Sequence, residues 1–286
     1  MHWGTIVAER VRSTGPLILG IDPVMDHAPT ILHGEPAVFL ESYVRALLDG
    51  AQGKIAFVKF QSACFEAFGS AGIVALARAI SSSRERGFAV IMDAKRGDIG
   101  STAQAYARAY LEPGLTDLEV DCLTVNPFLG PDTLEPFLEL ARAHGKGLFV
   151  LVKNSNPGSG WLQDQTIGGL TVSQRIADLV AGWADETLSE AGVGAVGAVV
   201  GATYPAEAME LRARMPRSVF LAPGLGAQGG DAKAMARLAT ATGPVLISAS
   251  RGIAAVDDPS LGVADYVGLI GRRIDAFREQ VSLAAV

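Results

Sequence analysis

The stretch that decides the fold reads Val90-Ile91-Met92-Asp93-Ala94-Lys95-Arg96-Gly97-Asp98. Its apolar run ends in two carboxylates and an ammonium group, with the spacing D-x-K-x-x-D. Because side chains alternate along a strand, we expect Asp93 and Lys95 to face the same way. Asp98 falls just past the strand, where Ile99 opens a helical pattern. Charges this dense are costly to bury unless they neutralise one another or bind something, so this strand end is a candidate site.

The same order, an apolar strand followed by a helical pattern, repeats along the chain. Strands that are nearly all apolar indicate a parallel sheet covered on both faces. Eight such units without a break in composition favour an α/β fold, a single (β/α)8 TIM barrel domain over residues 1–286. A doubly wound sheet is the alternative, but it usually has fewer strands and a glycine fingerprint after the first one. The expected strands are Leu17–Asp22, Ala56–Phe60, Ala89–Lys95, Cys122–Pro127, Gly147–Lys153, Ala198–Thr203, Val219–Pro223 and Val245–Ala249. The helical patterns include Ile73–Arg86, Thr102–Leu111, Thr133–Ala143, Ser173–Ala191, Ala232–Ala241 and Tyr266–Val281.

Composition narrows the class of protein. The chain has 286 residues, 49% of them hydrophobic, which is enough for a large core. A net charge of −6 argues against nucleic acid or an anionic membrane as a partner. No apolar run reaches membrane-spanning length and the first residues do not resemble a signal peptide, so we expect a cytoplasmic protein. Cys64 and Cys122 lack metal-ligand spacing and are expected to be buried, reduced thiols.

Two longer stretches, Pro23–Pro36 and Ser155–Gly169, are rich in glycine, proline and polar residues. Both follow strands directly, on the face where barrel enzymes keep their active sites. We therefore expect active-site loops, with tolerated insertions as the alternative.

Polar residues end five of the expected strands. They are Asp22, Lys59, Asp93 with Lys95, Asn126 and Lys153. In a parallel barrel all these ends meet at one mouth, so we expect their side chains to converge. Each has a structural alternative: a turn for Asp22, a solvent-directed amine for Lys59, an ion pair for Asp93 with Lys95, and a helix N-cap for Asp98. Their gathering on one face favours a functional site.

Two glycine-rich turns follow the last two strands, Pro223–Asp231 and Ser248–Ile253. Glycine lets backbone N–H groups approach an anion, and helix N-termini add partial positive charge. Barrels often bind phosphate at these two loops. Arg251 supplies a planar fork suited to phosphate, and Gln228 can donate beside it. The residues therefore predict a phosphorylated ligand whose reacting end lies at the charged strand ends.

The segment Asp93-Ala94-Lys95-Arg96-Gly97-Asp98-Ile99 resembles the signature of the orotidine 5′-phosphate decarboxylase family, specifically of its longer bacterial (type 2) subfamily. The similarity continues, in the family's order, through four further motifs. They are Gly20-Ile21-Asp22-Pro23, Val58-Lys59, Pro223–Gly230 and Ser250-Arg251-Gly252. The resemblance spans most of the chain. It implies a barrel that converts orotidine 5′-monophosphate to UMP and CO2 without cofactor or metal.

The resemblance also implies roles for single residues. Lys95 would protonate C6 of the pyrimidine as CO2 leaves, and Asp93 would face the substrate carboxylate. Lys59 and Asp98 would complete an alternating Lys-Asp-Lys-Asp network, with Asp98 reaching the ribose from the neighbouring subunit of a homodimer. The implied substrate-binding residues are Asp22 for the ribose, Ile99 and Thr102 beside Asp98, Ser155 for the pyrimidine edge, Gln228 and Arg251 for the phosphate, and Pro223 and Gly252. The sequence around Ser155 departs from the commoner family wording, so Asn154 and Asn156 stay open for that role.

Two other functions remain open at this point. One is a Mg²⁺-dependent sugar-phosphate decarboxylase or aldolase of a related barrel family. Those relatives usually place a metal-binding glutamate after the second strand, where this chain has Lys59. The other is a non-catalytic module that binds nucleotide phosphates, against which the placement of Lys95 among carboxylates speaks.

Overall fold

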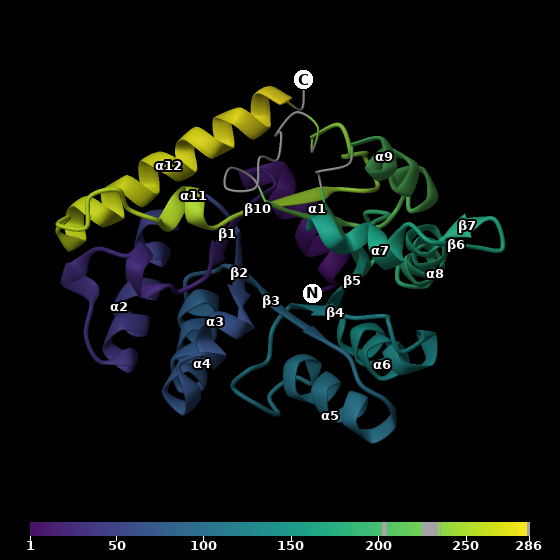
Figure 1. Ribbon diagram of the computed structural model, residues 1–286, viewed down its shortest axis with the longest axis horizontal. Coiled ribbons are helices and arrows are strands. Elements are labelled where there is room, and N and C mark those ends of the chain that lie inside the picture. The colour runs from purple at the N-terminus through teal and green to yellow at the C-terminus, as the bar shows by residue number, and fades with distance from the viewer. Residues whose placement is uncertain (202–204, 225–233, 235, 285–286) are drawn as a thin grey trace.

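The computed structural model describes residues 1–201, 205–224, 234 and 236–284. Eight parallel strands close into a barrel in the order β1-β10-β9-β8-β5-β4-β3-β2 (Figure 1), which confirms the predicted (β/α)8 fold. The strands are β1 (Leu17–Ile21), β2 (Phe57–Gln61), β3 (Ala89–Arg96), β4 (Cys122–Val125), β5 (Gly147–Lys153), β8 (Val196–Val200), β9 (Phe220–Pro223) and β10 (Val245–Ala249). A separate antiparallel hairpin pairs β6 (Thr166–Ile167) with β7 (Leu170–Thr171).

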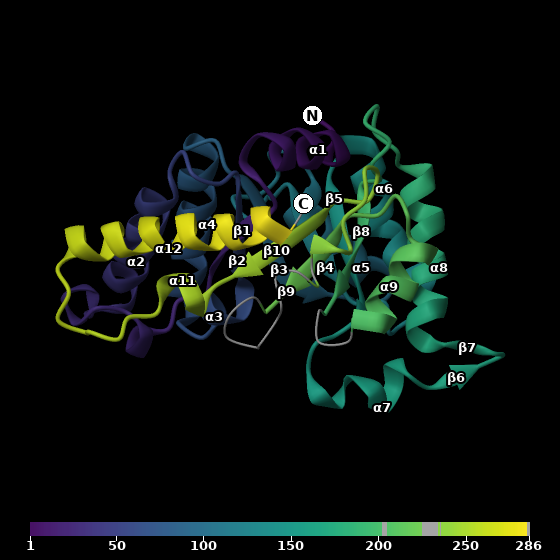
Figure 2. The ribbon, with the colours of Figure 1, turned by 90° about the horizontal axis from the view of Figure 1, so that it is seen from above.

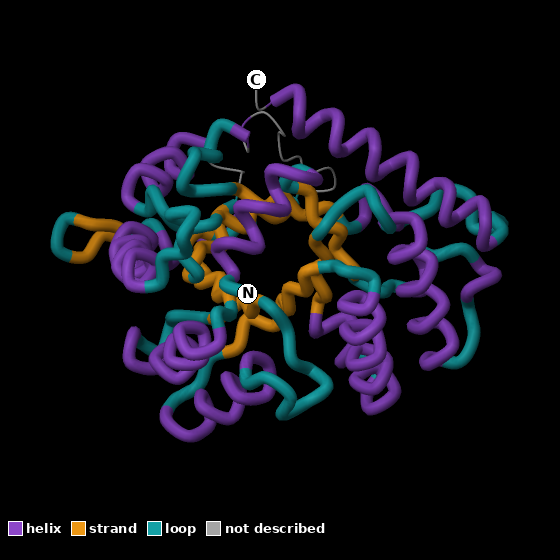
Figure 3. Tube along the Cα trace, turned by 180° about the vertical axis from the view of Figure 1, so that it is seen from behind, coloured by secondary structure: helices purple, strands orange, loops and turns teal. Residues whose placement is uncertain are grey.

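Helices surround the barrel (Figure 3). They are α1 (Trp3–Thr14), α2 (Pro36–Ala51), α3 (Ser62–Glu66), α4 (Gly69–Glu85), α5 (Gly100–Leu111), α6 (Glu135–His144), α7 (Gly160–Gln163), α8 (Val172–Glu186), α9 (Pro205–Arg214), α11 (Arg251–Ala254) and α12 (Val263–Ala284). Along β3, Val90 joins the core packed against these helices, while Ile91 joins a second core inside the barrel. Because both faces of each strand bury apolar side chains, the strands read as nearly continuous apolar runs.

Helix α1 fills the amino end of the barrel. Trp3 is fully buried, and its ring packs edge-on against Phe57 and Phe149, with centroids 6.3 and 6.2 Å away. Figure 2 shows α1 at one end of the molecule and α7 with the β6–β7 hairpin at the other. The filled amino end leaves the carboxyl ends of the strands as the place for a site.

The predicted elements differ from the structure mainly at their ends. The sixth strand begins earlier than predicted, at Val196, and Thr203 lies outside the described residues. Residues 232, 233 and 235 of the predicted helix Ala232–Ala241 lie outside them as well, and residues 237–241 form turns and irregular structure rather than the predicted helix. The predicted loop Ser155–Gly169 contains the short helix α7 and strand β6. Gln163 holds this segment in place, because its side chain accepts a hydrogen bond from the Asn154 amide at 2.9 Å.

The predicted loop Pro23–Pro36 also contains regular structure, the short 3-10 turns η1 (Met25–His27) and η2 (Thr30–Leu32). Both cysteines are free thiols, but only Cys122 is buried, and Cys64 on α3 is partly exposed. Within the described part of the chain, no helix has the length and apolar character needed to cross a membrane.

Candidate active site

A cavity of about 330 Å³ opens at the carboxyl ends of the barrel strands. Its lining residues are Asp22, Lys59, Gln61, Asp93, Lys95, Asn154, Ser155, Asn156, Val199, Leu221, Pro223, Gly224, Ser248, Ser250 and Arg251. Polar side chains from five strands or the loops after them thus line the cavity together with the apolar Val199 and Leu221. Three of the five polar strand ends predicted to converge therefore meet at one site.

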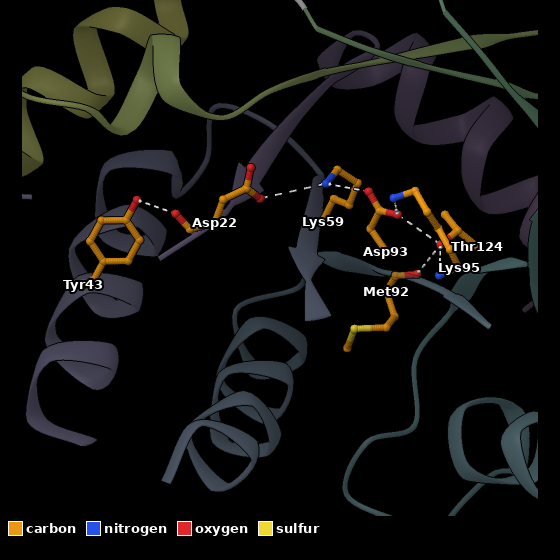
Figure 4. A network of polar contacts seen from close by, with 7 residues as sticks. All are labelled: Asp22, Tyr43, Lys59, Met92, Asp93, Lys95 and Thr124. Atoms are coloured by element: carbon orange, nitrogen blue, oxygen red, sulfur yellow. Dashed lines mark hydrogen bonds and ion pairs between the residues drawn. The ribbon is translucent and has the colours of Figure 1, made fainter. Parts of the chain in front are cut away.

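One carboxylate lies between two lysines at the centre of this site (Figure 4). Asp93 Oδ2 accepts a hydrogen bond from Lys59 Nζ at 3.1 Å, and Asp93 Oδ1 accepts one from Lys95 Nζ at 2.6 Å. Asp22 Oδ1 lies 4.0 Å from Lys59 Nζ on the other side. The order along the network is Asp22, Lys59, Asp93, Lys95, so opposite charges alternate.

This alternation sets the ionisation of the buried members. Burial by itself disfavours the charged form of Asp93, but the charges and hydrogen bonds of Lys59 and Lys95 outweigh it and lower its pKa to about 2. For Lys59, burial lowers the pKa, and the neighbouring Asp93 and Asp22 more than restore it, so the pKa lies above its ordinary value. Asp93 and Lys59 are therefore both charged at neutral pH.

The backbone of β3 bends to present Lys95. Parallel pairing with β4 matches Met92 to Leu123 and then Arg96 to Val125, which marks a bulge between them. Lys95 has φ +49°, and it is the one non-glycine residue with positive φ in the part of the chain that the structure describes. Such backbone strain is typical of functional sites. Asp93 and Lys95 meet as predicted, but through a bulge rather than simple alternation.

The Asp22 carboxylate carries an unused acceptor. Its Oδ1 is buried without a hydrogen-bond partner among the described atoms, although the residue lines the cavity. A buried acceptor without a donor is costly unless a ligand completes it. A ligand hydroxyl would satisfy this oxygen, which agrees with the ribose contact implied for Asp22.

Ser155 lies close to the neighbouring strand end. A Cβ on Gly201 would come within 2.8 Å of Ser155 Cα, so glycine is needed there for the two segments to approach. Ser155, Asn154 and Asn156 all line the cavity, and the choice among them for the pyrimidine edge stays a prediction.

The part of the site that is predicted to bind phosphate lies only partly within the described residues. Pro223, Gly224 and Arg251 line the same cavity, and Gly224 has φ +99°, which favours glycine. Gly252 follows Arg251 in α11 without lining the cavity. Gln228 lies outside the described residues.

Two polar strand ends do not reach the cavity. A register shift in β5 lies between Leu151 and Lys153, and Lys153 turns outward to pair with Asp164 and Glu207 beneath α8 and α9. The Asn126 side chain turns back to accept the Phe128 amide at 3.0 Å. Their predicted convergence with the other strand ends is wrong, because a register shift redirects Lys153 and a local hydrogen bond holds the Asn126 side chain.

Asp98, Ile99 and Thr102 also lie outside the cavity lining of this single chain. Asp98 Oδ1 accepts the adjacent Ile99 amide at 2.8 Å, whereas Ile99 occupies the N-cap of α5 without a side-chain cap. The interpretation of Asp98 as a helix N-cap is therefore wrong. Ile99 is 63% exposed, an unusual position for a large apolar side chain beside a site.

Three polar lining residues were not among the predicted site residues: Gln61, Ser248 and Ser250. Strand periodicity contained the signal for all of them. Gln61 is two residues after Lys59 on β2 and therefore shares its face. Ser250 lies two residues after Ser248, just past the end of β10, so strand alternation predicts that these two serines also share a face.

The buried network predicts a pH dependence of stability. Because the pKa of Asp93 lies below its ordinary 3.8, its charge contributes stability that is complete above about pH 4 and is lost as pH falls toward 2. The unfolding free-energy difference between wild type and Asp93→Asn should therefore shrink by about 1 kcal/mol from about pH 5 to about pH 3. Urea unfolding at several pH values measures this, with exposed Asp185→Asn as the control. A difference that stays constant with pH contradicts the assignment.

Comparisons with known proteins agree with this geometry. The family described as Orotidine 5′-phosphate decarboxylase / HUMPS family matches residues 15–266. The chain is 44% identical over 244 residues to an orotidine 5′-phosphate decarboxylase of Rhodopirellula baltica, covering 81% of each chain. It is 40% identical to one of Nocardioides sp., covering 93% of this chain and 96% of that one. The solved OMP decarboxylase of Leishmania donovani superposes with a TM-score of 0.74 at 30% identity, over 96% of this chain and 98% of that one. The chain therefore belongs to the orotidine 5′-phosphate decarboxylase family.

Proposed function

We propose that this chain is a carboxy-lyase that converts orotidine 5′-monophosphate to UMP and CO2, with Lys95 as the proton donor to C6. Membership of the family supports the reaction, since relatives at 40–44% identity carry the name of this enzyme. The observation that assigns the reaction to particular residues is the position of Asp93, which lies between Lys59 and Lys95 and lines the cavity. Residues 1–286 act as one barrel domain in this proposal.

Lys95 matches the electrostatic demand of the reaction. Breaking the bond between C6 and the carboxylate leaves an electron pair on a carbon that delocalises it poorly. A cation already fixed beside that carbon stabilises the charge as it develops, without reorganisation. Lys95 is held by Asp93 at 2.6 Å, and it can then deliver a proton to C6.

Asp93 would face the substrate carboxylate. Because its pKa is held at about 2, it stays ionised and repels that carboxylate at neutral pH. Departure of CO2 removes the repulsion, and the carbanion that remains lies next to Lys95. Lys59, which is buried and bonded to the other Asp93 oxygen, keeps the Asp93 side chain in this orientation.

Binding groups at the far side of the cavity would hold the nucleotide. Arg251 and the Pro223-Gly224 turn are suited to the phosphate, and the open Asp22 acceptor to a ribose hydroxyl. By the family resemblance, Ser155 is assigned to the pyrimidine edge and Gln228 to the phosphate, and Gly252 is assigned to substrate binding. Binding energy from the phosphate then orients the ring at the reacting end.

Asp98 completes the site from a second copy of this chain. The segment 97–99 packs beside the turn after β4, since a Cβ on Gly97 would lie 2.9 Å from Asn126 O. Ile99, Phe128 and Leu129 in these two segments are 63%, 71% and 50% exposed. Apolar side chains gathered beside a site favour burial against a partner. A homodimer would cover them and bring Asp98, Ile99 and Thr102 to the neighbouring cavity.

We assign the enzyme to the cytoplasm, with a nucleotide substrate and without a cofactor, a nucleic-acid partner or a membrane partner. The net charge of −6 supports the exclusion of polyanionic partners. At the end of β2, where sugar-phosphate lyases of related barrels usually carry a metal-binding glutamate, Lys59 pairs with Asp93.

Turnover of orotidine 5′-monophosphate tests the reaction directly. We expect purified wild type to convert orotidine 5′-monophosphate, measured as a fall in its absorbance, at the same rate with and without EDTA. Lys95→Ala should lose on the order of 10³-fold or more in kcat, because it removes the preorganised cation. Lys54→Ala, which removes a lysine paired with Asp275 on the outer surface, is the control and should keep full activity. Loss of activity in EDTA would favour the metal-dependent lyase. UMP binding without turnover would favour the binding module, and full activity of Lys95→Ala would remove Lys95 from its role.

Mixing inactive variants tests the shared site. In a heterodimer of Lys95→Ala and Asp98→Ala, one site carries both native residues, so an equal mixture should regain about a quarter of wild-type activity. A mixture of Lys95→Ala and Asp93→Asn is the control, and it should stay inactive because both residues act within one chain. If subunit exchange is verified and the first mixture stays inactive, Asp98 does not cross the subunit boundary.

A further inference from the structure

A buried threonine lies behind the charged network. Thr124 is on β4 with no exposed surface, and it lies outside the lining of the cavity. Its hydroxyl accepts the Lys95 amide N–H at 2.8 Å and lies 3.1 Å from Asp93 Oδ1 (Figure 4). The same hydroxyl lies 3.5 Å from the Met92 carbonyl. One side chain thus contacts both residues at the reacting end of the site.

The bulge explains why a hydroxyl is needed there. The ladder matches Leu123 to Met92 and Val125 to Arg96, so Thr124 alone on β4 faces the three residues of β3 from Asp93 to Lys95. The ordinary ladder leaves the Lys95 amide without a backbone acceptor. Thr124 Oγ1 provides that acceptor where Lys95 takes its positive φ. A buried amide without a partner would destabilise this backbone conformation.

The single proton of the hydroxyl has a preferred acceptor. Having accepted the Lys95 amide, Thr124 can donate to Asp93 Oδ1 or to the Met92 carbonyl. The carboxylate is nearer, at 3.1 Å against 3.5 Å, and hydrogen bonds to charged acceptors are the stronger ones. Asp93 Oδ1 then receives Thr124 and Lys95 Nζ, while its Oδ2 receives Lys59.

We propose that Thr124 is a positioning residue for decarboxylation. Its hydroxyl simultaneously fixes the Lys95 backbone in the bulge and the Asp93 carboxylate. This inference rests on the catalytic roles proposed above for Asp93 and Lys95. Thr124 lies outside the cavity lining, so it sets the geometry of the reacting groups without holding the nucleotide.

Three variants and two measurements test the proposal. Thr124→Val keeps the shape and removes the hydroxyl, and Thr124→Ser keeps the hydroxyl. The control is Thr187→Val, because Thr187 is also buried and also accepts a backbone amide, that of Ala195 at 3.1 Å, just before β8 at the amino end of the barrel. The measurements are kcat and KM for orotidine 5′-monophosphate, and hydrogen exchange of the Lys95 amide.

We expect Thr124→Val to lower kcat on the order of 10- to 100-fold with KM changed less than about threefold, since misplacing reacting groups by an ångström has this effect. Thr124→Ser should recover most of the loss, and Thr187→Val should keep the wild-type kcat. The Lys95 amide should be protected from exchange in wild type and Thr124→Ser, and unprotected in Thr124→Val.

Wild-type kcat in Thr124→Val, an equal loss in Thr187→Val, or a loss confined to KM would overturn the proposal. Failure of wild type to turn over orotidine 5′-monophosphate would instead contradict the proposed function. The exchange measurement decides the role of Thr124 even then, because a Lys95 amide that exchanges freely in wild type, or stays protected in Thr124→Val, overturns it. If Thr124→Val does not fold, Thr124→Ala replaces it with the same expected outcomes.

Discussion

The site depends on one buried carboxylate shared by two lysines. Asp93 lies 3.1 Å from Lys59 and 2.6 Å from Lys95, and this sharing keeps it ionised despite its burial. Removing either lysine would leave a buried charge less compensated, which is strongly destabilising. In the proposed reaction, the substrate would bring a second carboxylate close to Asp93. The negative charge left by the departing CO2 would then develop on the carbon beside the Lys95 cation.

The barrel makes this sharing possible by assembling the network from separate strands. Lys59 comes from β2, whereas Asp93 and Lys95 both come from β3. The bulge in β3 lies where the Lys95 ammonium contacts the Asp93 carboxylate of the same strand. Helix α1 fills the amino end with Trp3, so the polar groups gather at the opposite mouth. Arg251 stands at the end of another strand and lines the same cavity. The proposed phosphate contact and the proposed reacting groups thus lie on different strands of one barrel.

Much of this arrangement could be predicted from the sequence, because two regularities govern it. Parallel strands end at one mouth, and side chains alternate, which together place Asp22, Lys59 and Asp93 correctly. The errors arise where the backbone departs from those regularities. A register shift in β5 turns Lys153 outward into an ion-pair cluster, and Asn126 bonds its own turn. The proposed place of Asp98 in a neighbouring cavity requires a second chain, and no periodicity within one chain encodes such a contact.

A crystal structure of this chain with UMP bound tests the central claim most directly. The account predicts the pyrimidine C6 beside Lys95 and Asp93, the phosphate at Arg251, the positive φ of Lys95 retained, and Asp98 of a second copy near the ribose. A nucleotide bound away from the Asp93 carboxylate, or a Lys95 side chain turned away from the ring, would contradict it.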